Sequence, residues 1–237
     1  MAALRVQIWS DIACPWCYVG KRRLESALAS FDHRDAVEIR WRAFELDPAA
    51  PRTRPDGESQ AQRLASKYRM SVAQAEQRMR ELSELAAKDG LDLRFDRVRS
   101  GNTFDAHRLV ALARTHGIEG AAKERLLRAY FTEGLAIGDA AVLTRLGADI
   151  GIDPSSVAEV LASGAFADEV RADERLASEM GISGVPFFVF DERFAVSGAQ
   201  PSAVFASALA QAFRESAPQA PGAGAEAAPA CGADGCA

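Results

Sequence analysis

The sequence has little histidine, no excess of positive charge and no long apolar run. Its 237 residues carry 28 Lys and Arg against 33 Asp and Glu, which gives a formal net charge of -5. This balance argues against general nucleic-acid binding, which requires a basic surface. No apolar run approaches the roughly 20 residues that cross a membrane. The N-terminus also lacks the basic and apolar segments of a secretory signal. We therefore expect a soluble, cytoplasmic protein.

Cysteine is also scarce, and its placement is informative. The four cysteines form two close pairs, Cys14 with Cys17 and Cys231 with Cys236. A structural disulfide framework would spread its cysteines through the body of a small secreted chain. Close pairs in a cytosolic protein indicate redox chemistry or metal binding instead. The three histidines are scattered without metal-ligand spacing, so we expect no metal site, although His107 could line a cleft between domains.

The first fifty residues read as a strand, a helix and a second strand. Apolar residues alternate over 4–9 and again over 37–44, which is typical of strands, and a helical pattern begins at about Pro15. Two strands joined by one helix form a βαβ unit. We expect these strands to be parallel, with a right-handed crossover.

A linker rich in Pro, Arg and Asp over 48–57 leads into a long helical block. Ser71 and Gln74 fit a capping box, and Asp153 before Pro154 fits a helix start. Glycines follow the predicted helices and supply their stops. The first expected helix begins at about residue 72 and ends before Gly90. Further helices are expected over 104–116, 121–133, 139–150, from 154 onward and over 167–180.

Strand character returns after the helical block. Residues 187–190 and 194–196 read as an antiparallel pair around a turn, and a last helix runs from Pro201 to about Phe213. From Ser216 the composition is Ala/Gly/Pro-rich, which predicts disorder. The chain thus divides into residues 1–50, an all-α insertion over 58–180, residues 181–215, and a tail over 216–237. Without the insertion, the order β-α-β then β-β-α is that of an α/β thioredoxin fold.

The run Cys14-Pro15-Trp16-Cys17 has the form required for thiol–disulfide exchange. A thiolate must attack, and a second thiol must lie close enough to resolve the mixed disulfide. Cys14 falls at the predicted helix start, where backbone N–H groups favour an anion, and Pro15 suits the first helical turn. We therefore assign Cys14 as the attacking thiol and Cys17 as the resolving thiol. The alternatives are half of a zinc site or two unreactive core thiols.

Val185-Pro186 comes just before the third predicted strand. In this position the fold would need a cis peptide bond, which lets the Val185 backbone pair with an extended substrate and sets the proline ring against the active disulfide. An ordinary trans proline at the start of a strand is the alternative. Glu45 follows the second strand and could accept the proton of Cys17, or could be a solvated loop carboxylate.

Cys231 and Cys236 form a C-x4-C in glycine-containing sequence. The linker of about 15 residues that follows Ser216 would span roughly 20 Å as a coil. We consider that this auxiliary dithiol exchanges electrons with Cys14–Cys17. It could instead bind a soft metal ion or be a passive exposed tail.

Taken together, these residues resemble the DsbA family and, within it, the FrnE-like cytosolic branch. The resemblance covers residues 4–214 and implies a thioredoxin fold with a helical insertion. It also implies disulfide oxidase, reductase or isomerase activity on protein thiols, without a cofactor, with recycling by a cytosolic thioredoxin or glutathione system, and a tendency to form homodimers. The matching segments are residues 11–20, 44–48 and 181–188, with a weaker match at 102–108.

Trp16 departs from the family pattern. Periplasmic DsbA proteins have a histidine before the second cysteine, and an imidazolium stabilises a thiolate in a way that indole cannot. The strong oxidising power of DsbA, about -120 mV, is therefore not expected here. The tail cysteines also lie outside the core family pattern.

Two other functions remain open. The same fold resembles kappa-type glutathione transferases and 2-hydroxychromene-2-carboxylate isomerases, but those proteins typically have a serine where Cys14 stands. A holdase chaperone is the non-enzymatic alternative, because the insertion and the Pro186 groove could expose apolar surface to unfolded clients.

Overall fold

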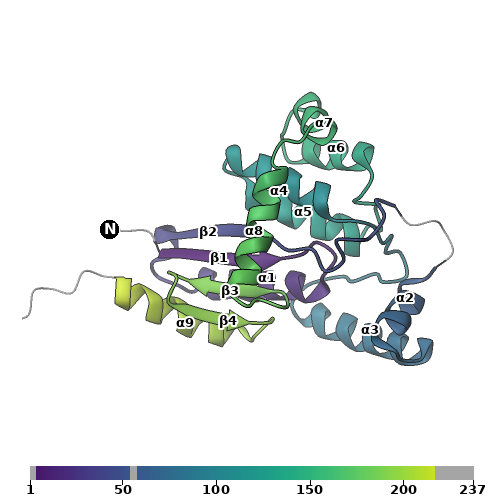
Figure 1. The fold of residues 1–237 in the computed structure, drawn as a ribbon. Helices are drawn as coiled ribbons and strands as arrows, with labels where there is room; N and C mark the ends of the chain where they lie inside the picture. Colours follow the sequence, from purple (N-terminus) through teal and green to yellow (C-terminus); the bar gives the residue numbers. More distant parts are fainter. Residues whose placement is uncertain (1–3, 54–57, 217–237) are drawn as a thin grey trace, which may run out of the picture.

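A computed structural model describes residues 4–53 and 58–216. Its sheet has the strand order β2-β1-β3-β4, as Figure 1 shows. Strands β1 (Leu4–Ser10) and β2 (Val37–Ala43) are parallel and are joined by helix α1 (Pro15–Ala29) and the 3-10 turn Arg34–Ala36. Strand β3 (Phe187–Phe190) runs antiparallel to β1 and to β4 (Phe194–Ser197). The predicted βαβ unit and C-terminal hairpin are both confirmed.

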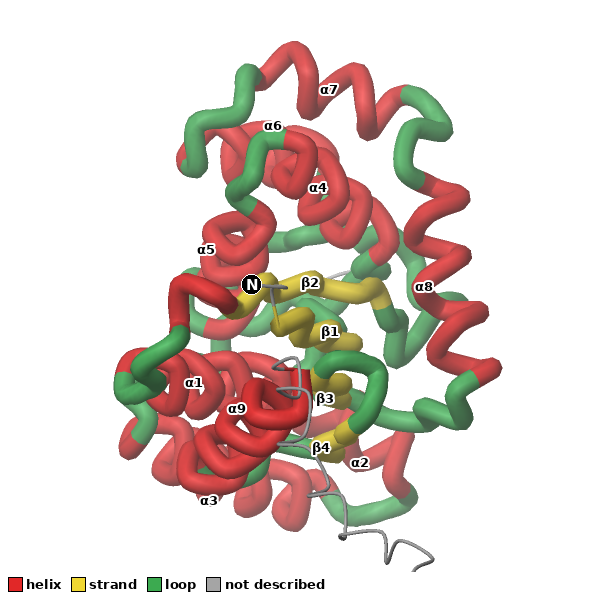
Figure 2. The backbone as a smooth tube through the Cα atoms, turned by 90° about the vertical axis from the view of Figure 1, so that its left-hand side faces the viewer, coloured by secondary structure: helices red, strands yellow, loops and turns green. Residues whose placement is uncertain are grey.

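Helices cover both faces of this sheet. Figure 2 shows α1 and α9 (Ser202–Ser216) on one side of the strands and α8 (Ala167–Glu179) on the other. Apart from Arg5, every residue of β1 is therefore buried. Because β1 is a central strand with helices on both sides, both of its faces are buried despite the alternating pattern in its sequence.

The inserted helices begin at capping side chains and end at glycines. The Ser71 capping box is confirmed, and a second box at Ser59 with Gln62, which we did not predict, starts α2. Asp139 and Asp153 cap their helices as expected. Gly90, Gly117, Gly134, Gly151 and Gly181 all have positive φ just past the helix ends. The helices are α2 (Gln60–Tyr68), α3 (Val72–Lys88), α4 (Phe104–Thr115), α5 (Glu119–Phe131), α6 (Ala140–Asp149) and α7 (Pro154–Ala162).

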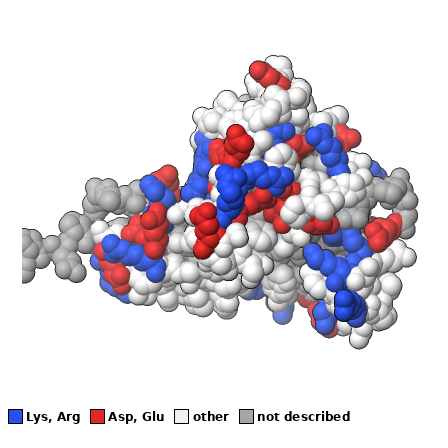
Figure 3. Space-filling model, viewed as in Figure 1, with Lys and Arg blue, Asp and Glu red and all other residues white. Residues whose placement is uncertain are grey.

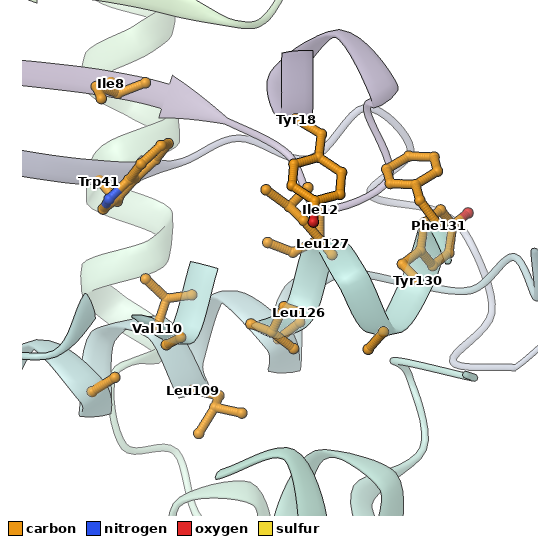
Figure 4. Packing of buried hydrophobic residues seen from close by; sticks show 14 of the residues in the cluster. Ile8, Ile12, Tyr18, Trp41, Leu109, Val110, Leu126, Leu127, Tyr130 and Phe131 are labelled. Carbon is orange, nitrogen blue, oxygen red and sulfur yellow. The ribbon is translucent and has the colours of Figure 1, made fainter. Parts of the chain in front are cut away.

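The insertion consists of two parts that pack differently. Helices α4 to α7 share one apolar core with the sheet, so that Ile8 and Trp41 from the strands pack in the same cluster as Leu126 (Figure 4). Helices α2 and α3 pair around a small cluster of their own, centred on Ala61, Ala65 and Ala75, and α3 also joins the main core through Ala86. We call α2 and α3 the arm.

Ion pairs fasten α8 to the sheet. Arg42 Nη1 lies 2.7 Å from Asp173 Oδ1, while Asp173 Oδ2 accepts the Ala43 N–H at 3.0 Å. Arg40 Nη2 lies 2.9 Å from Glu169 Oε1. Figure 3 shows basic and acidic side chains side by side in the middle of this face. Within the residues that the structure describes, no helix is long and apolar enough to cross a membrane.

Candidate active site

Cys14 and Cys17 lie where β1 passes into α1. Cys14 is the N-cap residue and Pro15 takes the first helical position, as predicted. The Cys14 N–H donates to Asp11 O at 3.3 Å, and the Cys17 N–H donates to Cys14 O at 3.1 Å. Both residues are free thiols with 5% and 1% of their surface exposed. Trp16, between them, is 42% exposed. Cys14 and Cys17 therefore lie buried on a tight turn, and Trp16 between them is exposed to solvent.

The Val185–Pro186 bond is cis, as the sequence analysis predicted. It brings the Val185 carbonyl to the active site, where Cys14 Sγ donates to it at 3.4 Å. Gly20 allows this approach, because a Cβ there would come within 3.1 Å of Pro186 Cγ. The Val185 carbonyl thus lies beside Cys14 Sγ. It is one of the two backbone groups of Val185 that we expected to pair with substrate.

The electrostatics at Cys14 differ from the sequence-based expectation. Its position at the helix start is confirmed, and a hydrogen bond from the Cys17 backbone favours the anion. However, the hydrogen bond to the Cys17 thiol and burial raise the pKa of Cys14 well above its ordinary value. Two buried sulfurs so close together resist ionising at the same time. Positive charge close to the dithiol would oppose these two effects and favour the Cys14 thiolate.

Asp11 and His107 form a buried pair next to this turn. His107 Nε2 lies 3.5 Å from Asp11 Oδ1, and both side chains are almost fully buried. Asp11 also accepts the Leu46 N–H at 2.8 Å and the Ala13 N–H at 3.3 Å. Burial raises the pKa of Asp11, but His107, the Leu46 N–H and the Thr103 side chain outweigh it and hold the pKa below its usual value. His107 therefore lies beside the dithiol turn and is buried.

Lys123 extends from α5 to the underside of the same turn. Its side chain is fully buried, and Nζ donates to Ser10 O at 3.2 Å and lies 5.5 Å from the centre of the Trp41 ring. Burial lowers its pKa to about 8, although Cys17, Asp11, Glu119 and Cys14 all favour the charged form. The inserted helices thus contribute a titratable cation to the surroundings of the dithiol.

Glu45 is buried, and its carboxylate has other partners than Cys17. Arg171 Nη1 donates to Oε1 at 2.6 Å, and Asn102 Nδ2 donates to Oε2 at 2.9 Å. Burial, opposed by Arg171, raises the pKa of Glu45 to about 7. The solvated-loop alternative is therefore wrong, because no part of this side chain is exposed. Proton acceptance from Cys17 stays a prediction, since both oxygens are engaged by other groups.

A cleft of about 480 Å³ opens between Cys14 and the arm. Its far wall is apolar, formed by residues such as Leu64, Met79 and Leu82, and Val185 closes the near side. Three cations also line it, namely Arg63, Lys67 and Arg78. The cleft thus combines a reactive thiol, an apolar wall and positive charge.

A model of the DsbA-like thioredoxin domain matches residues 5–210. The chain belongs to this family. The DsbA-like chain is also similar to a crystal structure described as a probable DsbA oxidoreductase from Streptomyces coelicolor. That likeness has 46% identity and a TM-score of 0.85, and covers 99% of this chain and 98% of the other. The fold class predicted from the sequence, a thioredoxin fold with a helical insertion, is therefore confirmed.

More distant similarities are found to a curated protein and to a solved structure. The uncharacterised protein YwbO of Bacillus subtilis is 27% identical over 209 residues, which are 87% of this DsbA-like chain and 96% of YwbO. The cytosolic disulfide reductase DsbM from Pseudomonas aeruginosa, solved with GSH, is 19% identical with a TM-score of 0.61, and the match covers 89% of this chain and all of DsbM. At this identity DsbM supports the fold alone.

Sequence reasoning located the cysteines and the cis proline of this DsbA-like site but missed much of their surroundings. Lys123 was not singled out, although it sits at the helical spacing of Leu126, Leu127 and Tyr130, all of them buried. A lysine on an apolar stripe was the available signal. The three cations of the cleft were not singled out either. Cys231 and Cys236 lie outside the residues that the structure describes.

Proposed function

We propose that the chain is a thiol–disulfide oxidoreductase that acts on protein substrates through Cys14 and Cys17. The arrangement of Cys14 carries this proposal: a thiol at a helix start, 3.4 Å from a carbonyl of the cis-proline loop, opening on a cleft. An extended substrate segment pairing with Val185 would bring its own sulfur to Cys14. Membership of the DsbA-like family supports the same chemistry.

The exchange balances without a cofactor. The Cys14 thiolate attacks one sulfur of a substrate disulfide, forms a mixed disulfide and releases the other substrate sulfur as a thiolate, which takes a proton. Cys17 then loses its proton and attacks the Cys14 sulfur, so that the Cys14–Cys17 bond forms and the second substrate thiolate leaves. Two electrons pass from the dithiol to the substrate. In an isomerase cycle the first released thiolate instead attacks another disulfide of the substrate, and the substrate thiolate freed there attacks the mixed disulfide, so that Cys14 leaves again as a thiolate.

The direction that we propose is reductive or isomerising, in the cytoplasm. Trp16 places an indole where an imidazolium would stabilise the thiolate, so the reduced form lacks the support that makes a strong oxidant. A thioredoxin or glutathione system would return the Cys14–Cys17 disulfide to the dithiol. A homodimer remains part of the proposal.

Two cysteine variants test this function. Cys14→Ser is expected to abolish the reduction of a protein disulfide such as that of insulin, because among residues 4–53 and 58–216 Cys14 is the thiol that lines the cleft. Cys17→Ser is expected to accumulate mixed disulfides that dithiothreitol dissolves, because the attacking thiol remains but cannot be resolved. Full activity in Cys14→Ser would refute the mechanism.

The cations of the cleft favour a second candidate, an enzyme that uses a small carboxylate-bearing thiol such as glutathione. Lys67 Nζ reaches Leu46 O at 3.5 Å and Arg63 contacts Gln60, and in the described part of the chain neither cation has a carboxylate partner. A volume of about 480 Å³ lies within the range of small-ligand sites. On this reading the chain would be a glutathione-dependent isomerase or transferase.

A series of three disulfide substrates separates the two candidate functions. Insulin, glutathione disulfide and the cationic cystamine are reduced in parallel, and Lys67→Glu is compared with wild type. Protein-directed activity predicts that insulin stays the best substrate in both chains. A loss confined to glutathione disulfide in Lys67→Glu would identify the cleft as a small-thiol site. Glutathione conjugation without disulfide reduction would favour the transferase.

Exposed apolar residues around the cleft keep the holdase alternative open. Trp16, Leu46 and Tyr68 line it and are 42%, 36% and 58% exposed. Unfolded clients bind such surfaces without any redox chemistry. A chain lacking all four cysteines that still suppresses aggregation of a reduced client would establish holdase activity apart from exchange.

A further inference from the structure

Lys123 is a buried cation without a carboxylate in contact. Its side chain has no exposed surface, and its partners are the Ser10 carbonyl at 3.2 Å and the face of Trp41 at 5.5 Å. Across residues 4–53 and 58–216, no carboxylate forms an ion pair with its Nζ. A buried charge is costly unless it is paired. An anion close to Lys123 would therefore stabilise its charged form at this buried position.

Lys21 shows how this protein ordinarily pairs a buried lysine. It is 4% exposed, and its Nζ contacts Glu25 at 2.5 Å and Glu124 at 2.6 Å. Two carboxylates thus neutralise Lys21, whereas Lys123 receives one backbone carbonyl and one aromatic ring. The contrast indicates that the counter-ion of Lys123 is not a permanent side-chain carboxylate.

Asp11 and Glu119, the carboxylates whose charge acts on Lys123, have other contacts. Asp11 accepts two backbone N–H groups and faces His107, and Glu119 lies 3.9 Å from Arg40. Ser10, which accepts from Lys123, is the residue directly before Asp11, and Asp11 O accepts the Cys14 N–H. Lys123 therefore lies under the turn that carries the dithiol. Burial lowers the pKa of His107, a second basic group beside this turn, although Asp11 opposes that shift.

We propose that Lys123 is the counter-ion of the thiolate that forms at Cys14–Cys17, and so is a positioning residue that the insertion supplies to the active site. This inference rests on the proposed thiol–disulfide exchange. The Lys123 ammonium lowers the free energy of the dithiol with one thiolate and leaves the disulfide without this support. When the dithiol reduces a substrate, the anion beside Lys123 disappears as the Cys14–Cys17 bond forms.

Lys123→Met tests the proposal on the thiol itself. The rate of Cys14 alkylation by iodoacetamide is followed against pH in the reduced protein, without any substrate. Removing the cation is expected to move the apparent pKa of alkylation upward by about one unit, so that the rate below that pKa falls about tenfold. At a pH above both alkylation pKa values, where the thiolate is the populated reduced form, the equilibrium with a thiol–disulfide buffer is expected to shift about tenfold toward the disulfide, which is about 30 mV for two electrons.

Matched variants separate charge from packing. Lys123→Arg keeps the charge and is expected to restore the wild-type alkylation profile. Lys21→Met removes a buried lysine that is already paired, and is expected to leave the alkylation pKa unchanged even if the protein loses stability. A folded Lys123→Met chain with the wild-type profile would overturn the proposal.

A measurement on the wild-type chain avoids variants altogether. The pKa of the Lys123 Nζ is followed by NMR in the dithiol and the disulfide forms. Loss of the neighbouring thiolate is expected to make that pKa lower in the disulfide form, and equal values in the two forms would refute the inference. Because neither readout involves a substrate, failure to reduce insulin with a normal Lys123 effect would refute only the proposed function.

Discussion

His107 Nε2 lies 3.5 Å from Asp11 Oδ1 in a buried contact that joins helix α4 of the insertion to the end of strand β1. The contact brings together residues 96 positions apart in the chain, beside the turn that carries the two thiols. The insertion therefore takes part in the environment of the active site, and the thioredoxin half does not build that environment alone.

The first prediction concerns the stability of this contact against pH. Burial lowers the pKa of His107, and Asp11 only partly offsets it. As pH falls below about 6.5, the unfolded chain takes up the imidazole proton before the folded chain does, so the free energy of unfolding decreases. Through this one group, the free energy of unfolding changes by at most about 1.4 kcal/mol per pH unit. His107→Asn is expected to reduce the loss of stability between pH 6.5 and pH 5.

Chemical denaturation of both reduced chains across this range measures the effect. Glu45 acts in the opposite sense, because its pKa is raised to about 7 and its folded form binds a proton more readily than its unfolded form. Taking the difference between wild type and His107→Asn at each pH removes the Glu45 contribution, which both chains share. Parallel stability curves would show that His107 does not titrate with folding.

The second prediction concerns the close approach of the chain around Arg52. A Cβ on Gly138 would lie 1.7 Å from Arg52 O, which is backbone and cannot turn aside. Gly138→Ala is therefore expected to destabilise the protein by roughly 1–3 kcal/mol through overpacking. Gly120→Ala is the control, because it lies within α5 with nothing within 4 Å, and alanine there is expected to add about 0.5–1 kcal/mol. Denaturant midpoints that move in the same direction for both variants would contradict this account.

The third prediction concerns the ion cluster that ties α1 to α5. Glu124 accepts from Tyr18 Oη at 2.8 Å and Lys21 Nζ at 2.6 Å, and contacts Arg22. Glu124→Gln leaves the buried Lys21 with one carboxylate. Because Glu124 itself is 30% exposed, the expected loss, on the order of 1–3 kcal/mol, is smaller than that for a fully buried pair.

The control for this cluster is an exposed ion pair. Glu38 lies 3.8 Å from Arg5 with both side chains more than half exposed, so Glu38→Gln is expected to change stability negligibly. Urea denaturation of the two variants at the same salt concentration makes the comparison. Equal losses would mean that the cluster has no more effect than a surface pair.

Features that depend on a few neighbouring residues could be predicted from the sequence. The strand periods gave the parallel βαβ unit, and Asp139 and Asp153 capped helices where side-chain chemistry required. The Cys14–Cys17 turn and the cis bond before Pro186 followed from the order of elements. Each of these depends on local backbone chemistry or on a known succession of strands and helices.

The groups that surround the dithiol could not be predicted, because they depend on how distant helices pack. Lys123 and His107 come from two inserted helices, and the sequence gives no register between those helices and β1. Glu45 illustrates the same limit. It follows β2, the neighbour of β1, yet its carboxylate turns to Arg171 of α8 and to Asn102. Proximity of strands did not determine the direction of that side chain.

The last prediction concerns the tail dithiol, Cys231 and Cys236, which lies outside the described residues. Helix α9 ends at Ser216, whose hydroxyl donates to Asp191 Oδ2 at 2.6 Å, at the end of β3 opposite to Pro186. Ser216 therefore lies at the end of the sheet away from Cys14. The Asp191 N–H donates to Arg5 O, and the five residue steps from Arg5 to Ser10 span roughly 17 Å at ~3.3 Å per strand residue. A coil of about 15 residues typically spans roughly 20 Å and at most about 50 Å, so Cys231 can reach Cys14.

If the tail relays electrons, deletion of residues 217–237 lowers steady-state turnover but leaves a single reduction of substrate by Cys14–Cys17 unchanged, because only recycling is lost. Replacing both tail cysteines by serine in the full-length chain should have the same effect, which separates thiol chemistry from the presence of the tail. Rapid-mixing and steady-state assays with the same reductant measure the two steps. Unchanged steady-state turnover in both variants would leave the tail without a redox role. A loss in the truncated chain alone would assign its effect to contacts other than the thiols.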